Sequence, residues 1–149
     1  MNVELRTLNV RDVPEPLPKP PGGKRIYDLE QRLLEFASSV IDVSESLPAT
    51  RSGNHVAGQI LRSGTSPYAN HGEAQEPESA ADFIHKLKVC LKELRETRRW
   101  ARLIERKSWR HGLAFVLREV EEPIRIFKAS IQTAERNRLL RRRSAPEAV

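Results

Sequence analysis

Apolar side chains recur every three or four residues over four long stretches, the spacing that places them on one face of an α-helix. The stretches cover residues 28–47, 54–73, 79–107 and 109–140. No stretch shows the strict alternation that a half-buried strand needs. Amphipathic helices joined by short connections bury their apolar faces only against one another, so the chain predicts an all-α fold, an antiparallel up-down four-helix bundle.

Proline, serine and small residues predict how these helices begin, bend and pack. Pro67 lies inside the second stretch, so a kink or break is expected near Ser63. Pro123 is expected to kink the fourth stretch or to split it into a short helix and a longer one. Ser79 is expected to cap the third helix, which would be about 40 Å long. The small residues of the second stretch predict close approach by a neighbouring helix: Gly58, Ser63, Gly64, Ala69 and Gly72.

The predicted core consists of one row of apolar residues on each helix. On the first helix, Leu34 and Ile41 are expected to widen the row that contains Leu33, Phe36 and Val40. On the third helix the expected row is Phe83, Leu87, Cys90, Leu94, Thr97, Ala101 and Ile104.

Both ends of the chain differ in composition from the predicted bundle. Residues 1–26 hold five prolines followed by Gly22 and Gly23, and proline fixes φ and lacks an N–H. We interpret this segment as an extended, disordered arm; a proline-rich ligand for a groove is the functional alternative. Residues 141–149 read as a basic disordered tail. The expected organisation is therefore an arm over 1–26, a bundle over 27–140 and a tail over 141–149.

The positive charge of the chain is concentrated in its last third. From Arg95 to the end, 15 Lys and Arg stand against 7 Asp and Glu, whereas through Leu94 the numbers are 11 and 13. Such asymmetry favours a polyanionic partner.

Seven basic residues of the third helix are spaced three or four residues apart and contain no acid between them at that spacing. This row is called the basic stripe, and it comprises His85, Lys88, Lys92, Arg95, Arg99, Arg102 and Arg106. Like charges at these spacings repel by about 0.2–0.5 kcal/mol per pair. A nucleic acid along the stripe would offset that cost; a solvated face screened by nearby glutamates and an oligomer contact are the alternatives.

Three further groups are candidates for binding or structural roles. Arg141, Arg142 and Arg143 form a second basic cluster, suited to phosphates or to keeping the chain soluble. Trp100 and Leu103 lie beside the core row and are candidates for an oligomer contact. A structural polar network is expected from Arg62, Asn70, Glu73, Glu93 and Glu96, in which Glu93 and Glu96 pair with Arg62 if the second and third helices are antiparallel.

Patterns typical of catalysis are missing from the sequence. It has no Gly-rich phosphate loop, no nucleophile elbow and no His pair at helical metal-binding spacing. We therefore expect no enzyme activity, no cofactor and no bound metal. Cys90 is the one cysteine, which excludes an internal disulfide. No apolar run approaches the ~18 residues of a membrane span and no signal peptide is recognisable, so a soluble cytoplasmic protein is expected.

The stretch 61–73, LRSGTSPYANHGE, resembles the central motif of the four-helix-bundle family of 23S ribosomal RNA intervening-sequence proteins. Asp82–Phe83, Leu87 and the residues 91–96, LKELRE, resemble the third helix of that family, and the resemblance extends from Tyr27 to Ile131. It implies a left-handed antiparallel bundle, commonly a homopentamer, without catalytic residues. Arg62, Asn70 and Glu73 match motif positions, whereas Gly64 and Gly72 stand where alanine is more usual.

The same family includes the accessory variability protein of diversity-generating retroelements, a basic pentamer that associates with a reverse transcriptase and nucleic acid. The resemblance thus implies three partners: further copies of the chain, nucleic acid and a reverse transcriptase. Our first hypothesis is a non-enzymatic oligomeric bundle that binds nucleic acid through the basic stripe as an accessory factor to a retroelement reverse transcriptase. The alternative is a scaffold or assembly protein with an acidic protein partner and no nucleic-acid role.

Overall fold

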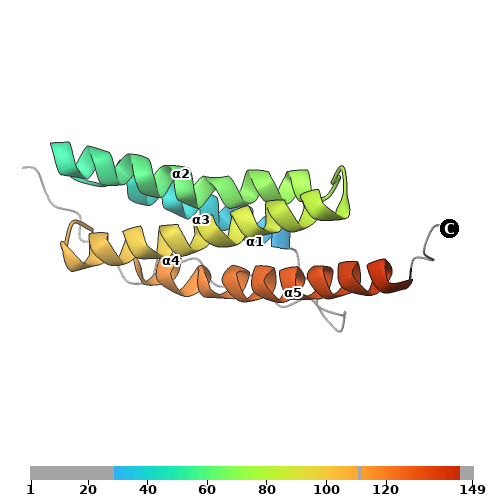
Figure 1. Cartoon of the computed structure of the whole chain (residues 1–149). Coiled ribbons are helices and arrows are strands. Elements are labelled where there is room, and N and C mark those ends of the chain that lie inside the picture. The colour runs from blue at the N-terminus through green and yellow to red at the C-terminus, as the bar shows by residue number, and fades with distance from the viewer. Residues whose placement is uncertain (1–28, 111, 145–149) are drawn as a thin grey trace, which may run out of the picture.

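The described part of the chain, residues 29–110 and 112–144 of a computed structural model, is built from helices joined by short connections. The helices are α1 (Leu29–Glu45), α2 (Arg51–Ala74), α3 (Ala80–Arg106), α4 (Ala114–Glu119) and α5 (Glu121–Ser144). Figure 1 shows α1, α2 and α3 running alternately up and down, with α4 and α5 in line as the fourth rod. The predicted antiparallel four-helix bundle is confirmed.

Helix α2 differs from the prediction at its start and at its proline. It begins three residues early, at Arg51, because the Thr50 side chain accepts a hydrogen bond from the Gly53 backbone N–H at 3.1 Å and caps the helix. It then continues through Pro67 as one helix, so the expected option of a break near Ser63 is wrong. Both residues are buried, and packing against the neighbouring helices offsets the one backbone hydrogen bond that the proline removes.

Sequence signals near the ends of the predicted helices correctly place the starts of α3 and α5. Ser79 caps α3 as predicted, since its hydroxyl accepts from the Asp82 N–H at 3.0 Å. The fourth stretch does split into a short and a long helix, at Val120, and Pro123 lies in the first turn of α5, where its missing N–H has no partner to lose.

Helix α5 also continues to Ser144, so Arg141, Arg142 and Arg143 are helical rather than part of a tail that starts at residue 141. Once the helix is under way, each further residue adds a hydrogen bond, and the sequence holds no breaker until Pro146. The predicted arm over 1–26 and the residues 145–149 lie outside the described part.

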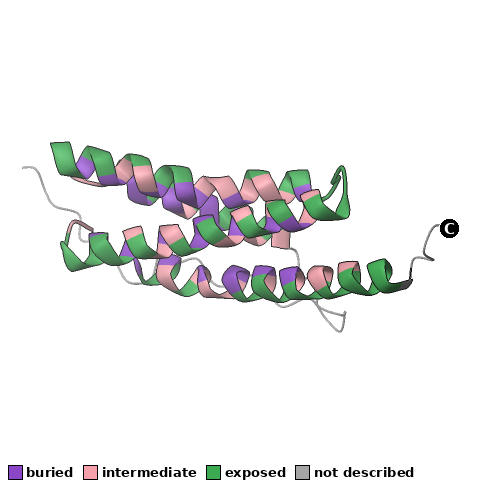
Figure 2. Cartoon of the chain, in the orientation of Figure 1, coloured by how far each residue is buried: buried purple, intermediate pink, exposed green. Residues whose placement is uncertain are grey.

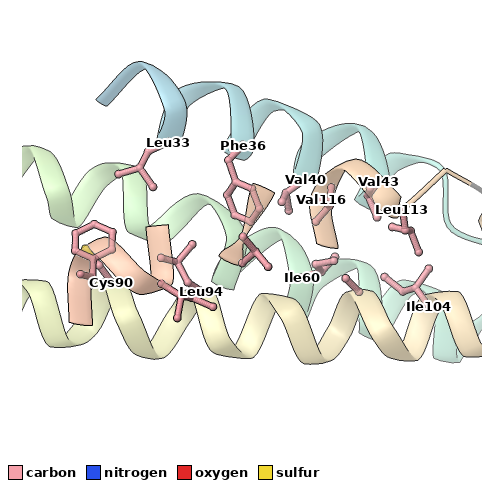
Figure 3. Close-up of a cluster of buried hydrophobic side chains, with 14 of the residues drawn as sticks. Leu33, Phe36, Val40, Val43, Ile60, Cys90, Leu94, Ile104, Leu113 and Val116 are labelled. Atoms are coloured by element: carbon pink, nitrogen blue, oxygen red, sulfur yellow. The ribbon is translucent and has the colours of Figure 1, made fainter. Parts of the chain in front are cut away.

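The core lies between α1, α2, α3 and the α4–α5 rod, and the labelled side chains of Figure 3 come from all of them. Phe36, Val40, Leu94 and Ile104 are at most 1% exposed, as their rows predict. On α2 the fully buried residue is Ile60, whereas its neighbour Leu61, which the spacing predicts for the core row, is 36% exposed. Cys90 is fully buried, and desolvation raises the pKa of its thiol to about 12, which keeps it protonated and unreactive.

Two predicted core residues lie at the surface instead. Leu34 and Ile41 are each 43% exposed, because α1 packs against α2 and α4 and has little contact with α5, which leaves one flank of α1 open. On α3 the half-buried Phe83 is replaced in the buried set by its neighbour Ile84. Figure 2 shows how burial is confined to the inward faces of the rods.

Close approach between α1 and α2 is confirmed at one glycine. A Cβ atom added to Gly64 would lie 2.4 Å from Cγ1 of Val40 on α1, far inside van der Waals contact. Gly58 and Gly72 have nothing within 4 Å of that position. Of these three glycines, only Gly64 is therefore required by the packing of α1 against α2.

His71 of α2 is half-buried and its ring meets the ring of Phe127 edge-on, with centroids 6.1 Å apart. Its Nδ1 atom is buried without a hydrogen-bond partner. Burial lowers the pKa of this histidine, and the negative charge of Glu30 counters part of the shift. The folded chain therefore favours the neutral ring.

We expect the free energy of unfolding to fall as the pH drops below 6.5, the ordinary pKa of histidine, because the unfolded chain then binds a proton that the folded chain resists. Urea unfolding between pH 7.5 and 5.5 measures this loss. In His71→Gln the loss should be smaller, while the exposed His85→Gln should behave as the wild type. Equal slopes in all three proteins would refute the assignment.

Candidate nucleic-acid interface

Helix α3 lies between α2 and α5, and its remaining side faces outward. The flank toward α2 carries Glu93 and Glu96, and the flank toward α5 carries Arg98, which pairs with Glu121 of α5 at 3.0 Å. The core row of α3 faces the inside of the bundle. The outward side is therefore the one place on α3 where a long row of charge stays in water.

All seven residues of the basic stripe are exposed on that outward side. From His85 to Arg106 the row extends over 22 residues of a single helix, about 32 Å at the usual rise. The side chains are neither scattered around the helix nor tucked into the bundle. The geometry on which the nucleic-acid hypothesis depends is thus present.

Ion pairing leaves most of the stripe uncompensated. Lys88 is the exception, since its Nζ lies 2.6 Å from Oε1 of Glu135 on α5. Within the described ranges, no carboxylate lies at ion-pair distance from the five other lysines and arginines of the stripe, which are Lys92, Arg95, Arg99, Arg102 and Arg106.

A shallow depression of about 460 Å³ lies along the middle of the stripe, lined by Lys88, Leu91, Lys92, Arg95, Glu96 and Arg99. Glu96 is the one acid in this lining, and its Oε1 already accepts from Nη2 of Arg62 at 2.5 Å and from Nε1 of Trp100 at 3.2 Å. Its charge is turned toward α2, so the depression presents cations to a ligand.

The predicted pairing of Arg62 with both glutamates is confirmed. Arg62 of α2 reaches Glu93 at 3.2 Å and Glu96 at 2.5 Å, and the side chain of Glu93 is only 8% exposed. A buried carboxylate requires such a partner, because leaving it buried and unpaired destabilises the fold by about 3–5 kcal/mol. This cluster fixes the register of α2 against α3.

Two other members of the expected network lie elsewhere. Asn70 donates to the Ser66 carbonyl and hydroxyl, one turn earlier on α2, at 3.0 Å. Glu73 pairs with Lys86 of α3 at 2.6 Å, about three turns after Arg62 along α2. The interface between α2 and α3 thus holds separate polar contacts rather than one network.

Sequence reasoning missed the contact at the centre of this interface. The hydroxyls of Ser63 and Thr97, both fully buried, lie 2.9 Å apart. The signal was available, because Thr97 stands on the core row of α3 and a buried hydroxyl needs a partner. Only the tertiary structure identifies Ser63 as that partner.

The two oligomer-contact candidates occupy different positions. Trp100 is half-buried and meets the ring of His55 on α2 edge-on, with centroids 6.2 Å apart. Leu103 is 40% exposed and lies on the outward side of α3, near Arg99 and Arg102. Of the two, Leu103 is the more exposed.

The three consecutive arginines near the end of α5 are exposed. Successive helical residues point about 100° apart, so the three arginines form no straight row: Arg141 and Arg142 line one depression and Arg143 lines another. They belong to a separate basic region and not to the straight row on α3.

Among the residues that the structure describes, no helix is long and apolar enough to cross a membrane. The same residues contain no group of three or more His, Cys, Asp or Glu side chains placed to hold a metal ion.

Comparisons with known proteins agree with this architecture. The family model for 23S rRNA-intervening sequence protein matches residues 27–111. A crystal structure from Bacteroides thetaiotaomicron, described as a protein with unknown function from the S23 ribosomal protein family, is 32% identical, with a TM-score of 0.64. The match covers 69% of this chain and 97% of that chain. No curated protein matches the sequence. With more than half of its length matched by the family model, this chain belongs to the 23S rRNA-intervening sequence protein family.

Proposed function

We propose that this chain is a non-enzymatic helical protein that binds nucleic acid through the basic stripe of α3. The observation that carries the proposal is the row of five exposed lysines and arginines without an ion-pair partner, held in line on one rigid helix. Each neighbouring pair in such a row repels by about 0.2–0.5 kcal/mol. A bound phosphate backbone turns that repulsion into attraction and releases counterions.

Binding of fluorescently labelled single- and double-stranded oligonucleotides over a salt series tests the proposal. With five phosphate contacts, we expect a slope of log K against log salt of about −3.5 for single strands and −4.5 for duplex DNA. The expected affinity is insensitive to sequence, because the stripe offers charge and no side chains arranged to read bases. Absence of binding at low salt would remove the proposal and leave the scaffold hypothesis, with an acidic protein surface as the partner.

Glu135 offers a gain-of-function prediction. Its carboxylate neutralises Lys88, so Glu135→Gln is expected to free this lysine for a phosphate and to steepen the salt slope by about 1. The matched control is Glu121→Gln, which frees Arg98 on the flank of α3 instead of on the stripe. Equal slopes for Glu135→Gln and the control would show that Lys88 takes no part in binding.

We include self-association and a reverse-transcriptase partner in the proposal. The exposed apolar residues Leu34, Ile41 and Leu103 support an assembly, since large apolar side chains at the surface are typical of contact sites. An oligomer would also present several stripes to one strand and raise its avidity. Light scattering of the purified chain tests the first part, and co-purification with a reverse transcriptase encoded beside it tests the second.

A further inference from the structure

A second surface feature lies between α3 and α5, on the side of this helix pair that faces away from the basic stripe. It is a groove of about 380 Å³ between the first turns of α3 and the last turns of α5. Phe83 and Ala134 contribute to its apolar floor, and Asn137, Arg138, Arg141 and Arg142 line it from α5. A neighbouring depression shares Phe83, Ala134 and Asn137 and continues the groove toward Ser130.

The groove occupies the place that α1 leaves open. Helix α1 has 17 residues against 27 in α3, and its first turn lies near the level of Phe127, because Glu30 acts on His71 and His71 touches Phe127. Beyond that level α5 continues for 17 residues, about 25 Å, without α1 beside it. Figure 1 shows α5 extending past the start of α1.

The residues that line the groove suit a ligand with an apolar body and hydrogen-bond acceptors. Three of its lining side chains are arginines, and each guanidinium carries N–H donors and no acceptor. The floor is aromatic and aliphatic. A proline-rich backbone has matching properties, because each proline keeps its carbonyl acceptor and lacks the N–H donor.

The chain carries such a segment directly before α1. Residues 14–21, PEPLPKPP, hold five prolines, and residues 22–28 link them to the start of α1. In a polyproline II conformation eight residues extend about 25 Å, close to the length of α5 beyond Phe127. Seven linking residues reach up to about 23 Å, enough to place the segment anywhere along the groove.

We propose that the segment 14–21 of the same chain docks in the groove between the start of α3 and the end of α5, with its backbone carbonyls toward Arg138, Arg141 and Arg142. The short link gives the segment a high effective concentration at the groove, of millimolar order, so even a weak contact is well occupied. The docked segment stands where α1 would continue in a longer bundle.

Crosslinking in the full-length chain tests this assignment. Leu17→Cys is combined with Ala134→Cys in the groove, and a short bismaleimide joins the two thiols. Cys90 does not interfere, because it is fully buried and unreactive. The matched control combines Leu17→Cys with Gln132→Cys, two residues away on an exposed side of α5 outside the groove. We expect the first pair to react within one chain at least about tenfold faster.

Neutralising the rim with Arg138→Gln, Arg141→Gln and Arg142→Gln should abolish that difference. Equal rates for the two pairs in the wild-type background would overturn the proposal, since they would reflect random collisions of a tethered segment. Crosslinks that join two chains, recognised by doubled mass, would also overturn it and assign the groove to the segment of a second copy. Nucleic acid is absent from the experiment, so its outcome is independent of the function of the stripe.

Discussion

Reversing three charges of the basic stripe, with Arg95→Glu, Arg99→Glu and Arg102→Glu together, is expected to weaken nucleic-acid binding by on the order of 100-fold or more at low salt. These residues are exposed, lie in the centre of the row and have no ion-pair partner among the described residues. Three phosphate contacts would be lost, and repulsion would replace them. The salt slope is expected to become shallower by about 2–3, which titration of a labelled oligonucleotide measures.

The control must change the net charge by the same amount away from the stripe. Arg51, Arg118 and Arg125 are exposed on α2, α4 and α5, and their joint replacement by Glu makes the chain as acidic as the stripe variant. If binding depends on the aligned row, the control should keep most of its affinity. An equal loss of affinity in both variants would mean that only the overall charge matters and that the stripe is not a specific binding site. Circular dichroism of each variant verifies that the bundle is intact.

Replacing Gly64 by alanine is expected to destabilise the bundle by roughly 1–3 kcal/mol, the range for overpacking a well-packed core. The new methyl group would lie 2.4 to 2.9 Å from three atoms of Val40, a fully buried β-branched side chain with one preferred rotamer. The helices α1 and α2 must then separate. Chemical unfolding monitored by circular dichroism measures the loss.

Gly58 is the matched control for this substitution, because it stands in the same helix with nothing within 4 Å of an added Cβ. Gly58→Ala is expected to stabilise the chain by about 0.5–1 kcal/mol, since alanine loses less backbone entropy in a helix. The two alanine variants should therefore shift stability in opposite directions. A second test pairs Gly64→Ala with Val40→Ala, which removes the colliding methyl groups and should recover part of the loss attributed to Gly64→Ala. Equal effects at both glycines would contradict the close approach of α1 and α2.

The polar contacts between α2 and α3 illustrate what is predictable about the candidate site. An antiparallel pairing was enough to bring Arg62 to Glu93 and Glu96, because those residues share one flank of their helices. It was not enough to place Asn70, which bonds to Ser66 of its own helix, or Glu73, whose pairing with Lys86 depends on the axial position of one helix against the other. The ion pair of Lys88 with Glu135 was missed for the same reason, since the two residues are 47 positions apart and on helices whose relative height no local pattern records.

Periodicity by itself determined the helices, their inward faces and the alignment of the basic stripe, because side chains three and four residues apart must share a face once a helix forms. The tertiary structure alone decided which cations stay unpaired, that Leu34 and Ile41 remain at the surface, and that Gly64 touches Val40. These properties arise from the distances and heights between neighbouring rods. Such quantities are set by the packing of the whole bundle and have no counterpart in the spacing of residues along one chain.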